Sequence, residues 1–150
     1  MASSSIIPSG GGSYTTWAAW ETAKDGVGGQ QEAELSGTGD AGPCTMDDWV
    51  NVTSANYPIM ESAKASRSAS VGRAGAYSNG VDTEAQVFLI NVPYTRVEGI
   101  QVYANDDQGG STGVTTNIVK VTADNVRVEC NMVVANNSIT GAAIYYLVSN

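Results

Sequence analysis

The sequence predicts an all-β protein: a short right-handed parallel β-helix (solenoid) with an α-helix capping its N-terminal end. The tripeptide Arg-Val-Glu occurs at 96–98 and again at 127–129, and both copies lie in strand-like segments. The chain is rich in Gly, Ser, Thr, Asn and Val, and only 15% of its residues are charged. Two strands plus turns that recur every ~20 to 50 residues are typical of a solenoid in which each repeat is one coil.

A single helix is predicted near the N-terminus, over residues 14–25. Thr15 or Thr16 can cap a run that begins at Trp17, and Asp25-Gly26 can end it. Trp17 and Trp20 are separated by two alanines, so they share one face of this helix. We therefore expect the helix to lie as a lid on an apolar core.

The rest of the chain divides into an arm and one domain. Residues 1–13 are mostly small or polar and are expected to form a flexible arm, while 14–150 form a single domain. Residues 26–84 read as irregular first coils with loops and short strands, and 85–150 as regular coils. The strands are expected at 50–53, 58–60, 86–92, 95–103, 117–122, 125–134 and 142–148, with turns at Pro93-Tyr94 and Ala123-Asp124.

The offset between the two Arg-Val-Glu copies predicts which side chains stack. Apolar residues would form inward rows and charged residues outward rows, and Gly99 would lie beside Cys130. The alternative fold is a β-sandwich, which explains short strands equally well but does not predict the common offset. The predicted stacks are Val97 on Val128, Ile90 on Val121, Glu98 on Glu129 and Arg96 on Arg127.

No assembled active site is evident, so no catalytic, cofactor-binding or metal-binding residue is predicted. The chain has no histidine, which removes histidine-based triads and histidine metal sites. Cys44 and Cys130 read first as small buried residues and otherwise as one disulfide.

Carboxylates remain the only candidates for chemistry. Asp47-Asp48 and Asp106-Asp107 are adjacent pairs. We interpret them as solvated residues of turns, and calcium ligands are the alternative interpretation. Glu98 and Glu129, flanked by arginines, are also similar to a lyase groove, although repetition alone explains them.

Charge and the N-terminal sequence limit the partners. A net charge of −8 makes nucleic acid a poor partner. The first residues have neither the basic start of a signal peptide nor the length of a membrane span, so no membrane association is expected. Tyr145 and Tyr146 are adjacent in a predicted strand, so one of them should point outward, to a subunit contact or to a sugar. The structural or interface candidates are Trp17, Trp20, Tyr145, Tyr146, Val97 and Val128.

Residues 14–25 and 85–150 resemble pectate-lyase-like right-handed parallel β-helix proteins of bacteriophage and environmental bacterial type. The resemblance is carried by Thr15–Glu21, by Tyr94–Val102 and by Asn125–Asn131. It implies a fold, and function only by analogy. Phage proteins of this type commonly form trimers, so the resemblance implies self-assembly. The last coil, for which the sequence predicts no cap, also favours self-assembly.

The function expected is therefore a non-enzymatic structural protein of a bacteriophage virion, as a capsid decoration or a tail or fibre component. Its partners would be further copies of the chain, other virion proteins and glycans. The alternatives are an extracellular polysaccharide-binding or polysaccharide-cleaving β-helix protein, or a subunit of an extracellular filament.

Overall fold

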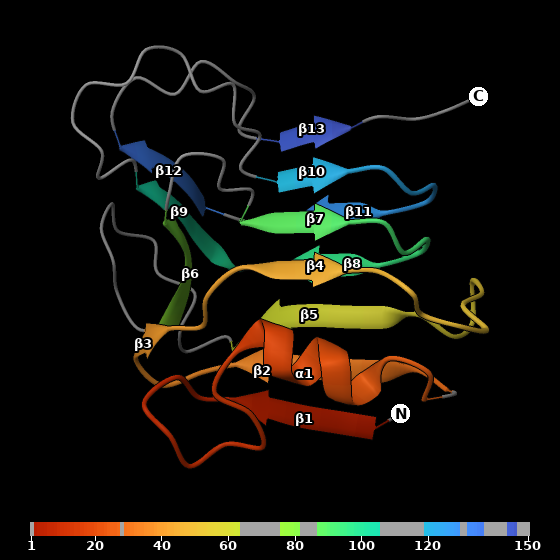
Figure 1. Ribbon diagram of the computed structural model, residues 1–150, viewed down its shortest axis with the longest axis horizontal. Coiled ribbons are helices and arrows are strands. Elements are labelled where there is room, and N and C mark those ends of the chain that lie inside the picture. Colours follow the sequence, from red (N-terminus) through yellow and green to blue (C-terminus); the bar gives the residue numbers. More distant parts are fainter. Residues whose placement is uncertain are drawn as a thin grey trace.

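The protein is β-rich, and its strands lie in parallel sheets with one short helix beside them (Figure 1). The computed structural model describes residues 2–27, 29–63, 76–81, 87–105, 119–129, 132–136 and 144–146. Among these residues the strands form three sheets.

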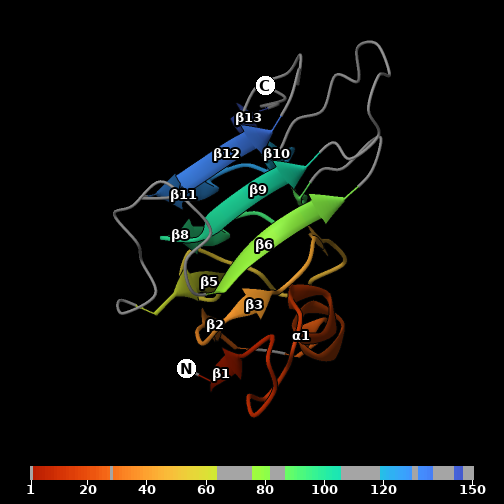
Figure 2. The ribbon, with the colours of Figure 1, turned by 90° about the vertical axis from the view of Figure 1, so that its left-hand side faces the viewer.

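Each sheet gathers strands that are far apart in the sequence. The first sheet has the order β1 (Ala2–Ile6), β2 (Gln31–Leu35), β5 (Pro58–Ser62), β8 (Arg96–Glu98) and β11 (Arg127–Glu129). The second has the order β4 (Cys44–Met46), β7 (Phe88–Ile90), β10 (Val119–Val121) and β13 (Ile144–Tyr146). The third, which faces the viewer in Figure 2, has the order β3 (Gly39–Asp40), β6 (Ala76–Val81), β9 (Gln101–Asn105) and β12 (Met132–Asn136).

The predicted stacking register is confirmed. The strands β8 and β11 pair Arg96 with Arg127, Val97 with Val128 and Glu98 with Glu129. The strands β7 and β10 pair Ile90 with Val121. All pairings between the named strands are parallel, whereas a β-sandwich would have antiparallel ones.

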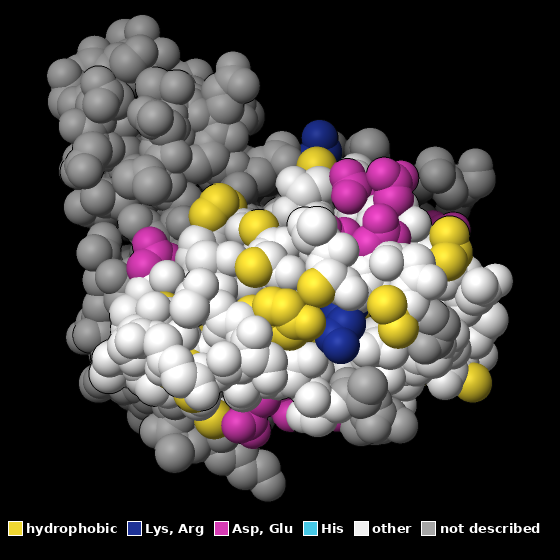
Figure 3. Space-filling model, turned by 60° about the horizontal axis from the view of Figure 1, so that its bottom comes forward, with side chains coloured by type: hydrophobic (Ala, Val, Ile, Leu, Met, Phe, Trp, Pro, Cys, Tyr) yellow, Lys and Arg dark blue, Asp and Glu magenta, His cyan; other side chains and the backbone are white. Residues whose placement is uncertain are grey.

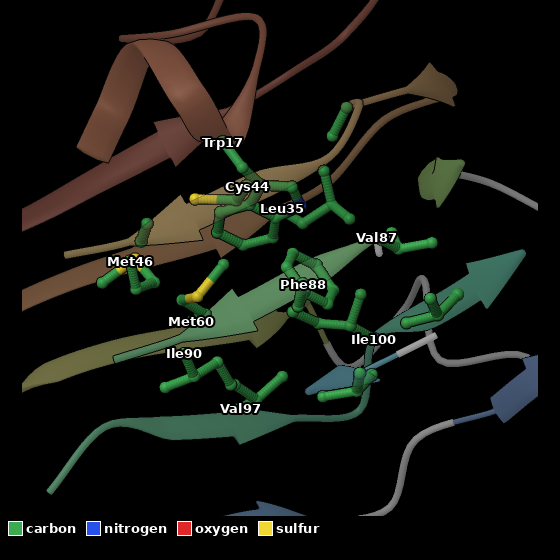
Figure 4. Close-up of a cluster of buried hydrophobic side chains, with 14 of the residues drawn as sticks. Trp17, Leu35, Cys44, Met46, Met60, Val87, Phe88, Ile90, Val97 and Ile100 are labelled. Carbon is green, nitrogen blue, oxygen red and sulfur yellow. The ribbon is translucent and has the colours of Figure 1, made fainter. Parts of the chain in front are cut away.

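Alternation along short strands builds the core. In β8 Val97 is buried while its neighbours Arg96 and Glu98 are partly exposed, because successive side chains of a strand point to opposite faces. The same alternation buries Ala33 of β2 and Met60 of β5, which precede Val97 in the same row of the first sheet. Figure 4 shows how side chains of the first and second sheets meet between them.

The helix α1 (Trp17–Lys24) covers the N-terminal end of this core, as predicted (Figure 1). Thr16 caps it, with its hydroxyl accepting a hydrogen bond from the backbone N–H of Ala19 at 3.2 Å. Trp17 and Trp20 are fully buried and pack edge to face, with ring centroids 6.1 Å apart. Trp17 also meets Phe88 of β7 edge to face at 6.3 Å, which joins the helix to the second sheet.

The turns between the second and first sheets repeat in conformation. Tyr94 and Asn125 both have a left-handed backbone, with φ of 60° and 59°. The N–H of Tyr94 donates to the carbonyl of Asp124 at 3.2 Å, and the N–H of Arg127 donates to the carbonyl of Thr95 at 2.9 Å. The predicted turn at Pro93-Tyr94 is confirmed, and the second turn is displaced from Ala123-Asp124 to Asp124-Asn125.

Three predicted strands are wrong. The single strand expected over 95–103 is two strands, β8 and β9, because Gly99 turns the chain with a φ of 67°. The strand expected over 125–134 is likewise divided into β11 and β12. The strand expected at 50–53 is a turn, in which Asn51 has a φ of 59° and Thr53 pairs with Asn56.

The arm expected over residues 1–13 is also corrected. Ala2–Ile6 form β1, which pairs in parallel with β2 along its whole length. Ile6 is fully buried, so the N-terminal segment belongs to the core. The region 26–84, expected as irregular coils, holds β2 to β6, and β5 confirms the strand predicted at 58–60.

We expect Ile90→Ala to lower the free energy of unfolding by about 2–5 kcal/mol, because it leaves a cavity in a packed core. Its neighbour Leu89 is only partly buried and points away from that core, so Leu89→Ala is the matched control and should cost clearly less. Denaturant unfolding of both variants measures the difference. Equal losses would contradict the assigned alternation of β7.

Candidate functional site

The outer face of the first sheet carries two rows of side chains in register. One row consists of glutamates from adjacent strands: Glu34, Glu61, Glu98 and Glu129. The other row is mixed: Glu32, Ile59, Arg96 and Arg127. We call these the glutamate row and the mixed row. They flank the inward-facing apolar residue at the centre of each strand, so alternation directs them away from the core.

The spacing of the sheet brings the glutamates close together. Adjacent strands lie about 4.7–4.9 Å apart, so neighbouring carboxylates repel unless solvent or a cation screens them. Arg127 offsets the repulsion between carboxylates at one end of the row, where its Nε lies 2.6 Å from Oε1 of Glu129. Both side chains are substantially exposed, so this ion pair contributes at most about 1 kcal/mol.

Arg96 has a different partner. Its guanidinium carbon lies 4.5 Å from the centre of the ring of Tyr57, the residue just before β5. A cation over an aromatic face is attracted by the ring quadrupole. The contact holds Arg96 on the outer face next to Glu98, so an aromatic ring, a cation and carboxylates lie together there.

The sequence predicted half of this surface. Glu98, Glu129, Arg96 and Arg127 come together as the repeated tripeptide indicates. Glu34 and Glu61 were missed because their intervals differ from the one between the two tripeptides. The chain from Glu34 to Glu61 is shorter than that interval, and the chain from Glu61 to Glu98 is longer. The signal available was a glutamate directly after an inward-facing apolar residue in each strand.

A second group of polar residues lies where α1 meets β4. A hollow of about 350 Å³ is lined there by Ala18, Glu21, Thr22, Pro43, Cys44, Thr45 and Asp47. Glu21 is 9% exposed, and its Oε1 accepts a hydrogen bond from the indole Nε1 of Trp49 at 3.1 Å. The ring centroid of Trp49 also lies 5.5 Å from that of Trp20, so these contacts fasten the loop after β4 to the helix.

The environment of Glu21 favours its neutral form. Burial raises the pKa of Glu21, and the nearby carboxylates of Asp47 and Asp25 raise it further. Hydrogen bonds from the Trp49 indole and from the backbone of Asp47 oppose the increase in the pKa. No candidate role was predicted for Glu21 because nothing in the sequence near α1 indicates that Trp49 approaches it.

Cys44 faces the core from β4, near Trp17 and Leu35 (Figure 4). It is 3% exposed and a free thiol, and burial raises its pKa well above the usual range. A thiol that stays protonated at neutral pH is a poor nucleophile and a poor metal ligand. The prediction that Cys44 is a small buried residue is confirmed, while Cys130 lies outside the described residues.

The other residues singled out from the sequence lie apart from one another. Trp17 and Trp20 are in the cap, and Val97 pairs with Val128 in the first sheet. Tyr145 and Tyr146 pair with Lys120 and Val121 in the backbone of β13, and their side chains are outside the description. Asp47 and Asp48 lie in the loop after β4, and Asp106 and Asp107 are not among the described residues.

Within the described ranges, no group of three or more Asp, Glu or Cys side chains is placed to hold a metal ion. The described part of the chain also contains no helix of the length and apolarity needed to cross a bilayer. Comparisons with protein-family models, with curated proteins and with solved structures gave no match.

We expect Glu21→Gln to change how stability depends on pH. Because the folded-state pKa of Glu21 is raised, folding takes up a proton, and the free energy of unfolding falls as the pH rises from about 4.5 through the raised value. Glutamine keeps an oxygen for the Trp49 indole but does not ionise, so the variant should lose this part of the pH dependence and gain stability at neutral pH.

Denaturant unfolding at several pH values between about 4 and 7 measures the effect of Glu21→Gln. Glu34→Gln removes the same charge from an exposed site and serves as the control. If both variants follow the same pH profile, the buried position of Glu21 has no energetic consequence.

Proposed function

We propose that the chain is a right-handed parallel β-helix and acts as a non-enzymatic structural protein of a bacteriophage virion, through self-assembly and surface binding. The observation that carries the proposal is the in-register parallel stacking of strands at one common offset, seen between β7 and β10, β8 and β11, and β9 and β12.

The order of the strands supports the helical path. The chain passes from β5 of the first sheet through β6 of the third and β7 of the second, and returns to the first sheet at β8, next to β5. The next passage, from β8 through β9 and β10 to β11, follows the same order. Connections between adjacent parallel strands of one sheet are right-handed in nearly all proteins, which favours a right-handed coil here.

The stacking also supports a mechanical role. From β2 onward, successive passages of the chain are joined by parallel strand pairing in three sheets, and the buried centres of β2, β5 and β8 belong to one continuous core. Such a body resists bending because every coil is held on several sides. The resemblance to phage-type β-helix proteins supports the virion setting and homo-oligomers, trimers among them, with other virion proteins as partners.

We expect the purified chain to form a discrete oligomer, because phage proteins of the proposed type assemble through their β-helices. Multi-angle light scattering over a wide concentration range measures this. The genes that flank the coding sequence provide a second test, and capsid or tail genes are expected there. A stable monomer at high concentration would contradict self-assembly, and neighbouring carbohydrate-enzyme genes would contradict the virion setting.

A second candidate function, an extracellular glycan-binding or glycan-cleaving β-helix, is favoured by the outer face of the first sheet. Tyr57, Arg96 and the glutamate row combine a ring, a cation and carboxylates on one extended surface. Aromatic rings and charged side chains of this kind suit sugar binding. A cleaving enzyme would also use two of the carboxylates, Glu98 and Glu129 being the pair to test.

We expect no cleavage of polygalacturonate or alginate by the unmodified chain, and therefore no difference in Glu98→Gln/Glu129→Gln. The glutamate row is better explained by repetition than by catalysis, because it extends over β2, β5, β8 and β11 in register. Release of unsaturated sugars, followed by absorbance, is the measurement. Turnover that the double variant abolishes would replace the structural proposal with the enzymatic one.

A further inference from the structure

The first strand of the first sheet has one edge that faces away from β2. In β1 the backbone groups alternate between the two edges, and the carbonyl of Ile6 accepts from Ser36 on the β2 side. The groups of Ser3, Ser5 and Ile7 therefore point to the opposite edge. Unpaired groups in such a row are a template for a strand from another chain.

Residues 8–14, which we call the return segment, fold back along this edge. The N–H of Tyr14 donates to the carbonyl of Ser5, and the N–H of Ile7 donates to the carbonyl of Tyr14, each at 3.0 Å. These two bonds form a parallel bridge opposite Ile6. The N–H of Gly10 also donates to the carbonyl of Ile7 at 2.9 Å.

Serine side chains complete the cover. The N–H of Ser5 donates to Oγ of Ser13 at 3.4 Å, and the N–H of Ser13 donates to Oγ of Ser5 at 3.0 Å. The return segment thus uses the N–H and the carbonyl of both Ser5 and Ile7. A strand that added to β1 would need those same backbone groups.

Gly12 allows the return segment to lie this close. A Cβ at this position would be 2.9 Å from the carbonyl oxygen of Ser5 and from Cγ1 of Ile7, and 3.0 Å from the N of Ile7. Two of these atoms belong to the backbone of the edge itself, so a larger residue must push the segment away from it. The glycine is required by the contact with β1.

We propose that the return segment is an edge guard, which prevents a second copy of this chain from adding a strand to β1. The partner it excludes is defined by the sheet itself: β11 is the opposite edge strand of the first sheet among the described residues. Head-to-tail stacking would place β11 of a second copy beside β1, parallel to it. The guard therefore opposes head-to-tail stacking into filaments.

The surface around the guard does not offer a large apolar contact in its place. Figure 3 views the end formed by β1 and α1, where small groups of hydrophobic side chains are scattered among polar ones. Strand pairing would be the main attraction between stacked copies, so blocking the groups of Ser5 and Ile7 removes most of it. The return segment blocks strand addition to β1 whether the chain serves in a virion or elsewhere.

The test compares Gly12→Val with Ser9→Val. The first variant displaces the return segment from β1, while the second adds the same side chain to an exposed position of the segment. We expect Gly12→Val to raise the weight-average mass about twofold or more with concentration, and to give end-to-end fibres in electron micrographs. Ser9→Val should keep the size of the unmodified chain. A folded Gly12→Val of unchanged size would overturn the proposal.

A rescue variant identifies the edge involved. Adding Ser3→Pro to Gly12→Val removes an outward-directed N–H, which an edge strand tolerates but a new partner strand does not. The association should then disappear, and persistence of the fibres would show that they form elsewhere and overturn the proposal.

Hydrogen exchange of the unmodified chain needs no variant and covers the case in which Gly12→Val fails to fold. The amides of Ser5 and Ile7 donate to the return segment and should exchange more slowly than that of Ser3, which lies earlier on the same edge. Equal exchange at all three amides would show that the guard is absent in solution.

Discussion

Backbone hydrogen bonding between parallel strands from successive passages of the chain is the constraint on which the structure depends. It fixes each residue directly over its counterpart, so the side chains at one position face the same side in every strand of a sheet. Met60, Val97 and Val128 are one such series, directed to the core, and the glutamate row is the adjacent series, directed outward. The core and the charged surface are thus two consequences of the same pairing.

At an end of the stack, other parts of the chain must cover the core side chains and the backbone groups that a further strand would have covered. At the N-terminal end the apolar interior is covered by Trp17 and Trp20 of α1, and the edge of β1 by the return segment. The tryptophans are an apolar cover because they meet core side chains, and the return segment is a polar cover because it meets the backbone groups of the edge strand. Glu21 connects the cap to the loop after β4, through its hydrogen bond with Trp49.

The sequence predicted the parts in which the repeat is regular. Arg96–Glu98 and Arg127–Glu129 have identical residues, so their register could be derived, as could the cap with its two tryptophans. The earlier strands of the same sheet are separated by other lengths of chain, which hide their relation to the later ones. Ala2–Ile6 consists mostly of serine, and only its pairing with β2 makes it a strand. The corner at Gly99 interrupts an otherwise convincing apolar alternation, and a glycine inside a strand pattern was the one available warning.

The length of chain between paired strands varies, whereas the distance between those strands in the sheet does not. Gln31 pairs with Pro58, and Ile59 pairs with Arg96 after a longer stretch of chain, yet both pairs belong to one evenly hydrogen-bonded sheet. The rise along the stack is therefore that of a sheet, whatever the length of chain between two paired strands. Insertions at the corners can widen the molecule at a chosen level, or give it a new contact there, without changing its height.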